Sequence, residues 1–412
     1  MNAERLLTRF LEYVQIDTTA NETSQSYPSS AGQWELGKLL VRQLQSHGLA
    51  DVHQDEHGLV WATLAATASG DIPTIAFNAH LDTSPETSGT HVKPQVIRNY
   101  GGGDIVLPGD PQQVIHVAEN PALKTLPGAT LITSDGTTLL GGDDKAGVAV
   151  IVEAAAHLSQ HPEIPHGPIR LLFTCDEEIG RGVSHVDLEK LGATVCYTLD
   201  GSGAGEIDVE TFSADLATVT VRGVNIHPSI AKGRMINALR TAGEFLARLP
   251  RDHLAPEATD GRLGFIHPYY IDGGVGQAVL KLILRDFQTP QLARQARLLT
   301  ALAAEVEEVF PGVKIDVAIT RQYRNMAEGL ARQPRAVEFA ERAHQQLGLA
   351  VKRTIVRGGT DGALLTEKGL ASPNLSTGQH NPHSRLEWAC LDEMVQATRV
   401  LVELVQVWAQ RE

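Results

Sequence analysis

The chain has 412 residues, of which 42% are hydrophobic and 20% charged, which is the composition of a protein that buries a core rather than that of a disordered or collagen-like chain. At roughly 150 residues per domain, this length corresponds to two or three domains. With 35 basic and 49 acidic residues the net charge is −14, so we expect neither nucleic acid nor an anionic membrane surface as a partner.

The cysteines and the N-terminus indicate the compartment. Cys175, Cys196 and Cys390 are far apart and odd in number, which fits neither a disulfide framework nor a cysteine-based zinc site. The first 14 residues carry charges within their apolar stretch, unlike a signal peptide, and no run of 18 apolar residues predicts a membrane span. We therefore expect a protein of the reducing cytoplasm.

The first half of the chain alternates predicted helices with predicted strands. Helices are predicted at residues 33–47 and 145–158, and apolar runs typical of buried strands lie at 74–78, 169–174 and 195–199. This alternation predicts an α/β fold, with a mostly parallel sheet and helices on both of its faces. Residues 84–138 are rich in Gly, Pro and Thr and predict a loop-rich excursion with an extra hairpin.

After residue 211 the pattern becomes that of a β-α-β-β-α-β unit, the ferredoxin-like arrangement. The elements that define it are a strand at 216–222, a helix at 234–248, a strand at 277–286, a helix at 290–309 and a strand at 313–320. The α/β pattern then returns, with a helix at 334–347, a strand at 351–356 and a terminal helix from about 390. We therefore predict one discontinuous domain, residues 1–210 and 326–412, with an α+β domain at 211–325 inserted into it.

Acidic residues and histidines stand where the predicted buried strands end. His80 and Asp82 follow one strand, Asp176-Glu177-Glu178 follow a second, and Asp200 follows a third. In open α/β sheets ligands bind at the carboxyl ends of the strands, and charged residues are seldom buried without partners. This pattern predicts a functional site at that edge of the sheet.

Taken singly, each motif has an ordinary structural explanation. His80 and Asp82 are spaced so that the carboxylate can fix the tautomer of a metal-binding imidazole, but an exposed turn accounts for them as well. In Gly141-Gly142-Asp143-Asp144 one aspartate is explained as a helix cap, although the two glycines are not. A His-rich loop near the C-terminus leaves His380 and His383 in competition for any ligand role.

Together these residues form a donor set that suits Zn²⁺, Co²⁺ or Mn²⁺ in a hydrolytic site. Two adjacent glutamates can divide the work, one binding metal and the other reaching the water beside it. Three protein ligands for each of two metals result if one aspartate bridges them, which leaves a position for a shared water. The ligands in this arrangement are His80, Asp143, Glu178, Asp200 and His383.

In this order the motifs resemble those of the M20 family of metallopeptidases, from about residue 5 to 408, and among its members the tripeptide aminopeptidases most closely. The resemblance includes segments away from the acidic motifs, namely Asn225-Ile226-His227-Pro228, Tyr323-Arg324-Asn325-Met326 and Arg357-Gly358-Gly359-Thr360-Asp361. It implies an aminopeptidase that removes the N-terminal residue of a small peptide.

The resemblance also implies roles for individual residues. Two zinc ions would be held by the five ligands named above. Asp143 is preferred to Asp144 because the first aspartate of the family's Ala-Asp-Asp-Lys pattern is the bridging one. His383 is preferred to His380 because an acid, Glu387, follows it four residues later, as in the family. Asp82 would orient His80, and Glu177 would be the general base. The inserted domain would be a lid or a dimerisation domain. In the second case the protein would be a homodimer. The implied substrate contacts are His227, Arg357 and Asn325.

The sequence departs from the family at positions that affect substrate preference rather than the ligands. Gly142 replaces the usual Ala, Cys175 replaces a Pro, and Ser229 and Ser384 replace glycines. A dipeptidase, a carboxypeptidase or an N-acyl amino acid deacylase would share the same metal site. A binding protein with a structural metal is a further alternative, but such a site needs no general base, so the presence of Glu177 argues against it.

Overall fold

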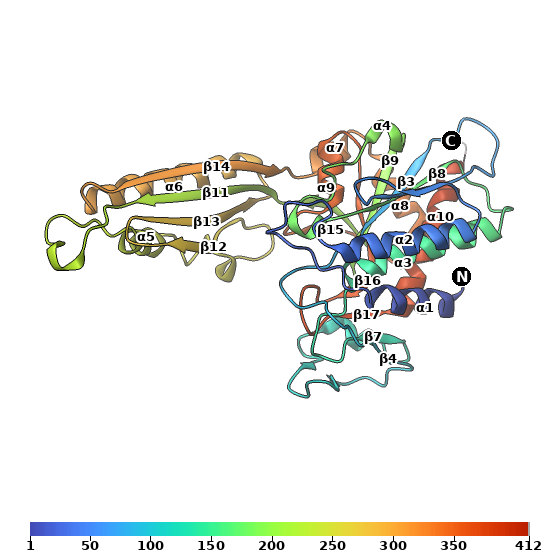
Figure 1. The fold of residues 1–412 in the computed structure, drawn as a ribbon. Helices are drawn as coiled ribbons and strands as arrows, with labels where there is room; N and C mark the ends of the chain where they lie inside the picture. Colours follow the sequence, from blue (N-terminus) through green and yellow to red (C-terminus); the bar gives the residue numbers. More distant parts are fainter. Residues whose placement is uncertain (411–412) are drawn as a thin grey trace. The chain divides into compact units, whose positions relative to one another are not determined.

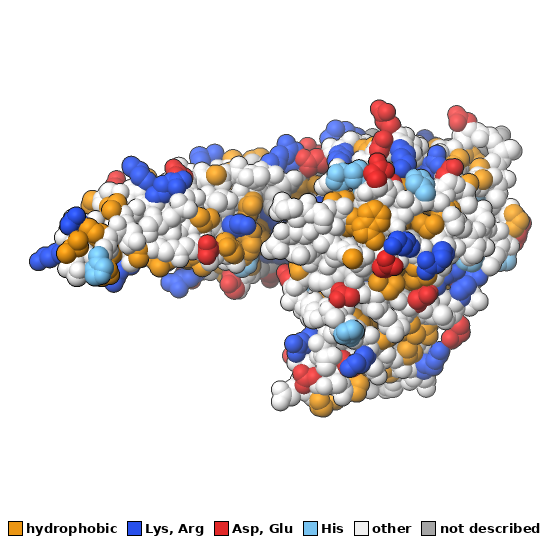
Figure 2. Space-filling model, viewed as in Figure 1, with side chains coloured by type: hydrophobic (Ala, Val, Ile, Leu, Met, Phe, Trp, Pro, Cys, Tyr) orange, Lys and Arg blue, Asp and Glu red, His pale blue; other side chains and the backbone are white. Residues whose placement is uncertain are grey.

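The computed structural model describes residues 1–410, which form two compact units (Figure 1). The first unit comprises residues 1–209, 326–354 and the chain from 360 onward, and the second comprises 210–325 and 355–359. In the described chain, no helix combines the length and the apolar character needed to cross a membrane. Basic and acidic side chains are interspersed over the face shown in Figure 2.

The first unit contains a sheet whose four central strands run parallel. All six residues of the strand Ile75–His80 are buried, as expected for a parallel strand covered on both faces. The flanking strands are antiparallel and extend the parallel centre that the sequence predicts. In spatial order the strands are β1 (Ala50–Gln54), β2 (Val60–Leu64), β8 (Ile169–Thr174), β3 (Ile75–His80), β9 (Val195–Ser202), β16 (Asn374–His380), β17 (Trp388–Cys390), β7 (Leu131–Thr133) and β4 (Gln95–Ile97), while β10 (Glu206–Thr211) pairs with β16 and with β15 (Lys352–Val356).

Helices cover both faces of this sheet, which confirms the predicted α/β class. Thr198 and Leu199 are neighbours on β9 and therefore point to opposite faces. The side chain of Thr198 lies near Gly362 of α9 (Asp361–Glu367), whereas Leu199 lines a small cavity with residues of α10 (Leu391–Ala409). The helices are α1 (Ala3–Val14), α2 (Ala31–Ser46), α3 (Gly142–Gln160), α4 (Leu188–Leu191), α7 (Ala327–Ala331), α8 (Arg335–Gln346), α9 (Asp361–Glu367) and α10 (Leu391–Ala409).

The loop-rich excursion contains the predicted hairpin, formed by β5 (Ile105–Val106) and β6 (Val114–Ile115). It also contributes β4 and β7 to the main sheet. Strands of two or three residues are too short to show a periodic pattern, which explains why the sequence does not predict these two.

The second unit is a four-stranded antiparallel sheet in the order β12-β13-β11-β14, with two helices on one face (Figure 1). Its elements in chain order are β11 (Ser213–Arg222), α5 (Ala238–Ala247), β12 (Phe265–Gly273), β13 (Gln277–Asp286), α6 (Thr289–Val309) and β14 (Lys314–Tyr323). Alternate residues of β11 and β13 are buried against the helices, the period-2 pattern of a sheet covered on one side. This is the ferredoxin-like arrangement that the sequence predicts.

Candidate metal centre

The parallel strands bring their carboxyl ends to one edge of the first unit's sheet. His80, the last residue of β3, pairs in register with Thr174, the last residue of β8. The acidic turn Asp176-Glu177-Glu178 therefore begins beside His80. Asp200 lies near the end of the neighbouring β9, and His383 follows β16.

One buried carboxylate connects this histidine to the acidic turn. Asp82 Oδ1 lies 3.3 Å from His80 Nδ1, and the Asp82 carboxylate accepts hydrogen bonds from the backbone N–H groups of Glu177 and Glu178, each at 3.0 Å. The backbone oxygen of Asp82 also lies 3.0 Å from His80 Nδ1. With Nδ1 occupied in this way, His80 directs Nε2 towards the other acidic groups.

The Asp143 carboxylate lies between two imidazoles. Its Oδ1 is 3.0 Å from His80 Nε2, and its Oδ2 is 3.5 Å from His383 Nε2. Glu178 Oε2 lies 2.9 Å from the same His383 nitrogen, and Asp200 Oδ1 lies 3.8 Å from His80 Nε2. The structure thus brings all five residues predicted as metal ligands into one group.

Asp144 also lies near His80 and Asp200, but its carboxylate is engaged elsewhere. One oxygen accepts the backbone N–H of His80 at 3.1 Å, and the other accepts that of Gly147 at 3.2 Å. Asp144 is fully buried by these contacts. Of the two adjacent aspartates, Asp143 is therefore the one whose oxygens face both histidines.

A similar comparison separates the two histidines of the C-terminal loop. The His380 ring stacks on Trp388 at 3.7 Å, and its Nε2 lies 2.6 Å from Glu393 Oε2 on α10. His383 instead faces Glu178 and adopts a left-handed backbone conformation with φ +63°. Such a conformation is unusual for a residue with a side chain, and it often marks a position held for function.

The three carboxylates of the acidic turn have different partners. Asp176 accepts hydrogen bonds from the backbone N–H and hydroxyl of Ser29 and from the Gln33 amide, so it is tied to the N-terminal region. The preceding Cys175 is buried, with its thiol near the Gly58 carbonyl at 3.5 Å. Glu177 and Glu178 remain as the glutamates close to the histidines.

The pKa values reflect the crowding of acidic groups. Burial, followed by the charge of Asp143, raises the pKa of Glu178 to about 7 and the pKa of Asp200 well above its usual value. Burial likewise raises the pKa of Glu177. Burial opposes ionisation of Asp143 as well, but hydrogen bonds with His383 and His80 lower its pKa overall. Carboxylates held this closely are stabilised by positive charge.

The donors fit a divalent transition metal. Glu178 Oε1 is buried and has no hydrogen-bond partner among the described residues. An unpaired buried carboxylate oxygen is costly, and a cation would satisfy it. Two imidazoles with carboxylates are the ligands that zinc, cobalt and manganese accept, and the absence of thiolates from the group is typical of catalytic rather than structural sites.

Two carboxylates that the sequence does not single out as functional also hold the group. Glu387 is buried and accepts backbone N–H bonds from Leu140, Gly141 and Asp143 at 2.7 to 2.9 Å. Glu86 Oε2 lies 3.3 Å from His383 Nδ1. The spacing of Glu387 from His383 is the only sequence signal for the first, and no signal marks the second.

The three predicted substrate contacts belong to the second unit. His227 is exposed, with Nδ1 2.7 Å from the Ser229 hydroxyl. The Asn325 amide donates to the Phe287 carbonyl at 3.0 Å. Arg357 donates to the carbonyls of Thr259, Gly261 and Leu263, and its guanidinium lies over the rings of Phe212 and Phe265. Of the three, His227 is the side chain most open to a ligand.

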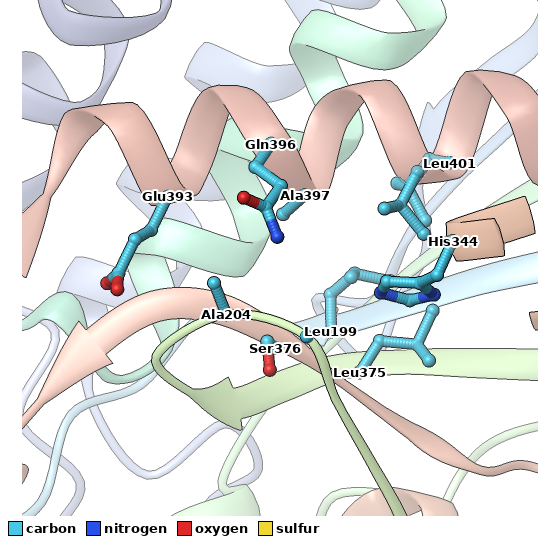
Figure 3. Close-up of a pocket in the computed structure, with 11 residues that line it drawn as sticks. Leu199, Ala204, His344, Leu375, Ser376, Glu393, Gln396, Ala397 and Leu401 are labelled. Carbon is cyan, nitrogen blue, oxygen red and sulfur yellow. The ribbon is translucent and has the colours of Figure 1, made fainter. Parts of the chain in front are cut away.

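A small cavity lies elsewhere in the first unit, beneath α10 (Figure 3). Glu393 and Gln396 of α10 line it together with His344, Leu199 and Leu375. Its volume is about 10 Å³, which is room for a single water molecule. The cavity is therefore too small for a peptide and does not compete with the strand-end group as a substrate site.

Comparisons with known proteins identify the family and the fold of the chain. Residues 135–407 match the model of "Peptidase family M20/M25/M40". A Peptidase T from Geobacillus sp. is 43% identical over 406 residues, covering 98% of this chain and 99% of the relative. The crystal structure of aminopeptidase PepT from Bacillus cereus has a TM-score of 0.75 and 25% identity over the full length of both chains. A Bacillus subtilis protein described as a dinuclear metal binding peptidase shares the fold, with a TM-score of 0.65 and 15% identity over 99% of this chain and 98% of that one.

Proposed function

This chain belongs to peptidase family M20, and we propose that it is a metal-dependent aminopeptidase that releases the N-terminal residue of tripeptides. Relatives matched over almost their whole length bear the name Peptidase T, which supports this substrate class. The single observation that carries the proposal is the Asp143 carboxylate, whose two oxygens face the imidazoles of His80 and His383.

We propose that two Zn²⁺ ions occupy the group, with Co²⁺ or Mn²⁺ as substitutes that accept the same donors. Asp143 would be the shared ligand, and the others would be His80, Glu178, Asp200 and His383. When bound, such cations polarise the scissile carbonyl and lower the pKa of a water molecule. Glu178 Oε1 is buried without a hydrogen-bond partner among the described residues, which supports the proposal of a cation on that side of the group.

Glu177 is the proposed general base. It would take a proton from the attacking water and pass it to the leaving amine, which is general-base and then general-acid catalysis. Asp82 supports this role, because its carboxylate holds the backbone of the turn that presents Glu177 and also orients His80. A base fixed in this way loses little entropy on reaching the reactive geometry.

Recognition of the peptide is assigned to the second unit. We propose that His227 contacts the substrate, and that Arg357 and Asn325 contribute at its C-terminal end. The last two side chains already have partners within their own unit, so His227 is the first of the three to test. We also propose a homodimer in the reducing cytoplasm, where the three buried free cysteines are stable. Light scattering after size exclusion tests the oligomeric state.

The decisive experiment compares free tripeptides with matched dipeptides, N-acetylated tripeptides and N-acyl amino acids, while bound metal is counted by elemental analysis. Release of the N-terminal residue from free tripeptides alone, with about two metal ions per chain, is expected for this site. Cleavage of the blocked substrates would instead indicate a deacylase or carboxypeptidase on the same fold. Bound metal without any cleavage would favour a binding protein.

A further inference from the structure

Two histidines lie side by side at the end of α3 opposite to the candidate metal centre. His157 lies in the last turn of α3, and His161 is the residue that follows Gln160, where the helix ends. Their ring centroids are 4.3 Å apart, with the planes tilted by 40°. Both residues are half-buried, so their rings are restricted in movement yet reachable from solvent.

The hydrogen bonding of these rings suits metal binding. Nδ1 of His161 lies 2.9 Å from Glu163 Oε1, which favours the tautomer that leaves Nε2 with a free lone pair. The His157 ring forms no hydrogen bond within the described part of the chain. Burial, followed by the charges of the chain's N-terminus and of His161, lowers the pKa of His157, so its ring is neutral at neutral pH.

The charges around this pair are of both signs, with the chain's N-terminus and Arg5 on the positive side. Arg5 is the guanidinium whose charge reaches His157, and it is paired with the buried Glu153 at 2.7 Å and with Gln160 at 3.0 Å. Glu153 also pairs with Arg9 at 2.6 Å, so its carboxylate offsets the charge of Arg5 only in part. Glu163 is exposed and adds a negative charge next to His161.

We propose that His157 and His161 form an additional metal site, which binds one divalent transition cation through their imidazoles, with Glu163 orienting His161. Imidazole is a ligand for Cu²⁺, Zn²⁺ and Ni²⁺, whereas Mg²⁺ and Ca²⁺ prefer oxygen donors. Water completes the coordination. His157 lies 12 residues beyond Lys145, where the regular helical backbone of α3 begins, which is a separation of about 18 Å along the helix. This site is therefore independent of the strand-end group and of the proposed peptidase activity.

The test uses Cu²⁺ as the probe on the full-length protein with its other sites already loaded with zinc. We expect the wild type to bind one Cu²⁺ whose electron paramagnetic resonance spectrum shows coupling to two imidazole nitrogens. His157→Ala and His161→Ala should each abolish that signal at equimolar copper. Glu163→Gln should keep the two-nitrogen spectrum but weaken binding roughly tenfold, the lower end of the usual effect of removing a carboxylate behind a ligand.

A matched control separates this pair from ordinary surface binding. His116 is a lone exposed histidine with its own carboxylate partner, Asp104, at 2.7 Å, and His116→Ala should leave the copper signal unchanged. The proposal fails if the wild type gives no two-nitrogen signal, or if His116→Ala loses it as readily as the two test variants. Tripeptide hydrolysis should be equal in all five proteins, and since the readout is binding, an inactive wild type would count against the proposed function alone.

Discussion

The candidate metal centre and the substrate-contact residues of the second unit differ in how they are held. At the strand ends, Asp82, Asp144 and Glu387 are buried, and each accepts at least two backbone N–H bonds. In the second unit, His227 is exposed on a loop, and its ring contacts only the nearby Ser229 in the described structure. The buried carboxylates therefore fix the geometry of the metal centre, whereas the side chain of His227 is free to adjust to a ligand.

This difference predicts where loss of function should be severe. Catalytic groups need sub-ångström placement, and their positioning residues transmit errors directly to the reacting atoms. An exposed loop residue can contribute binding energy, but its loss leaves the chemistry assembled. The variants below test that ranking, starting with the one expected to have the largest effect.

Removal of the proposed base should have the largest effect on turnover. Glu177→Ala is expected to lower kcat by roughly 10²–10⁴ because proton transfer loses its partner, while bound metal stays unchanged. Steady-state tripeptide hydrolysis and elemental analysis measure the two quantities. Glu178→Ala is the matched contrast and should lose metal. The assignment would be reversed if Glu177→Ala lost metal and Glu178→Ala kept it.

Glu387→Gln tests a residue that acts through the backbone of Asp143. The neutral amide accepts the three N–H bonds less strongly and places an N–H donor against them, so the loop that carries Asp143 should shift. We expect metal affinity or kcat to fall roughly 10–100-fold, with KM changed little. Glu393→Gln, which alters a carboxylate partner of His380 rather than of a proposed ligand, is the control. Equal losses in both variants would show a general effect on the fold.

Much of this region could be predicted from sequence because its signals are local. The apolar runs that become β3, β8 and β9 end in His or acidic residues, and the carboxyl ends of parallel strands must meet. The roles of Glu86 and Glu387 could not be predicted in this way. They act on His383 and on the loop before Asp143 from distant or unpatterned segments, and such pairings depend on tertiary packing.

The same limit applies to the elements of the fold. Strands β8 and β13 occur at the predicted residues because their hydrophobic patterns are long and clear. Helix α5 begins at Ala238 rather than at 234, because the Asn237 side chain caps it by accepting the N–H groups of Leu239 and Arg240. The two-residue strands β5 and β6 could be expected only as a hairpin somewhere in a loop-rich region.

A buried acid behind the metal centre should give stability a pH dependence. Burial raises the pKa of Asp361 to about 6, above its value in an unfolded chain, so the folded state holds the proton more tightly. Its stabilising contribution is full below about pH 4 and is lost as pH rises to about 6, at about 1.4 kcal/mol per pH unit. Denaturant unfolding of metal-free wild type and Asp361→Asn at pH 4 to 7 measures this. A difference between them that does not change with pH would refute it.

His227→Ala tests the more loosely held region. Loss of a polar substrate contact should lower kcat/KM about tenfold, equivalent to about 1.4 kcal/mol, without changing metal content. His253→Ala, another exposed histidine of the second unit, should have no effect. If His227→Ala were to lower kcat as strongly as Glu177→Ala, the distinction between a fixed region and an adjustable one would fail.

The smallest effect is expected at Gly142, where the resemblance to the family predicts Ala. An added methyl group would lie 3.2 Å from Glu387 Oε1, closer than a normal contact, and 3.6 Å from Gln379 Cβ. In its favour, Ala reduces the entropy of the unfolded chain, which stabilises by about 0.4–1 kcal/mol where the backbone tolerates it. Because three N–H bonds hold the Glu387 carboxylate, we expect the close contact to offset this gain.

Gly142→Ala should therefore change the free energy of unfolding by less than about 1 kcal/mol, and kcat only a few-fold, measured by denaturant titration and tripeptide hydrolysis. A double-mutant cycle with Glu387→Gln sharpens the test, because residues in contact give non-additive effects. Coupling between the two substitutions would show that Gly142 leaves room for the carboxylate that positions Asp143. Additive effects would show that the methyl group fits without moving Glu387, and the departure from the family would then carry no consequence for the site.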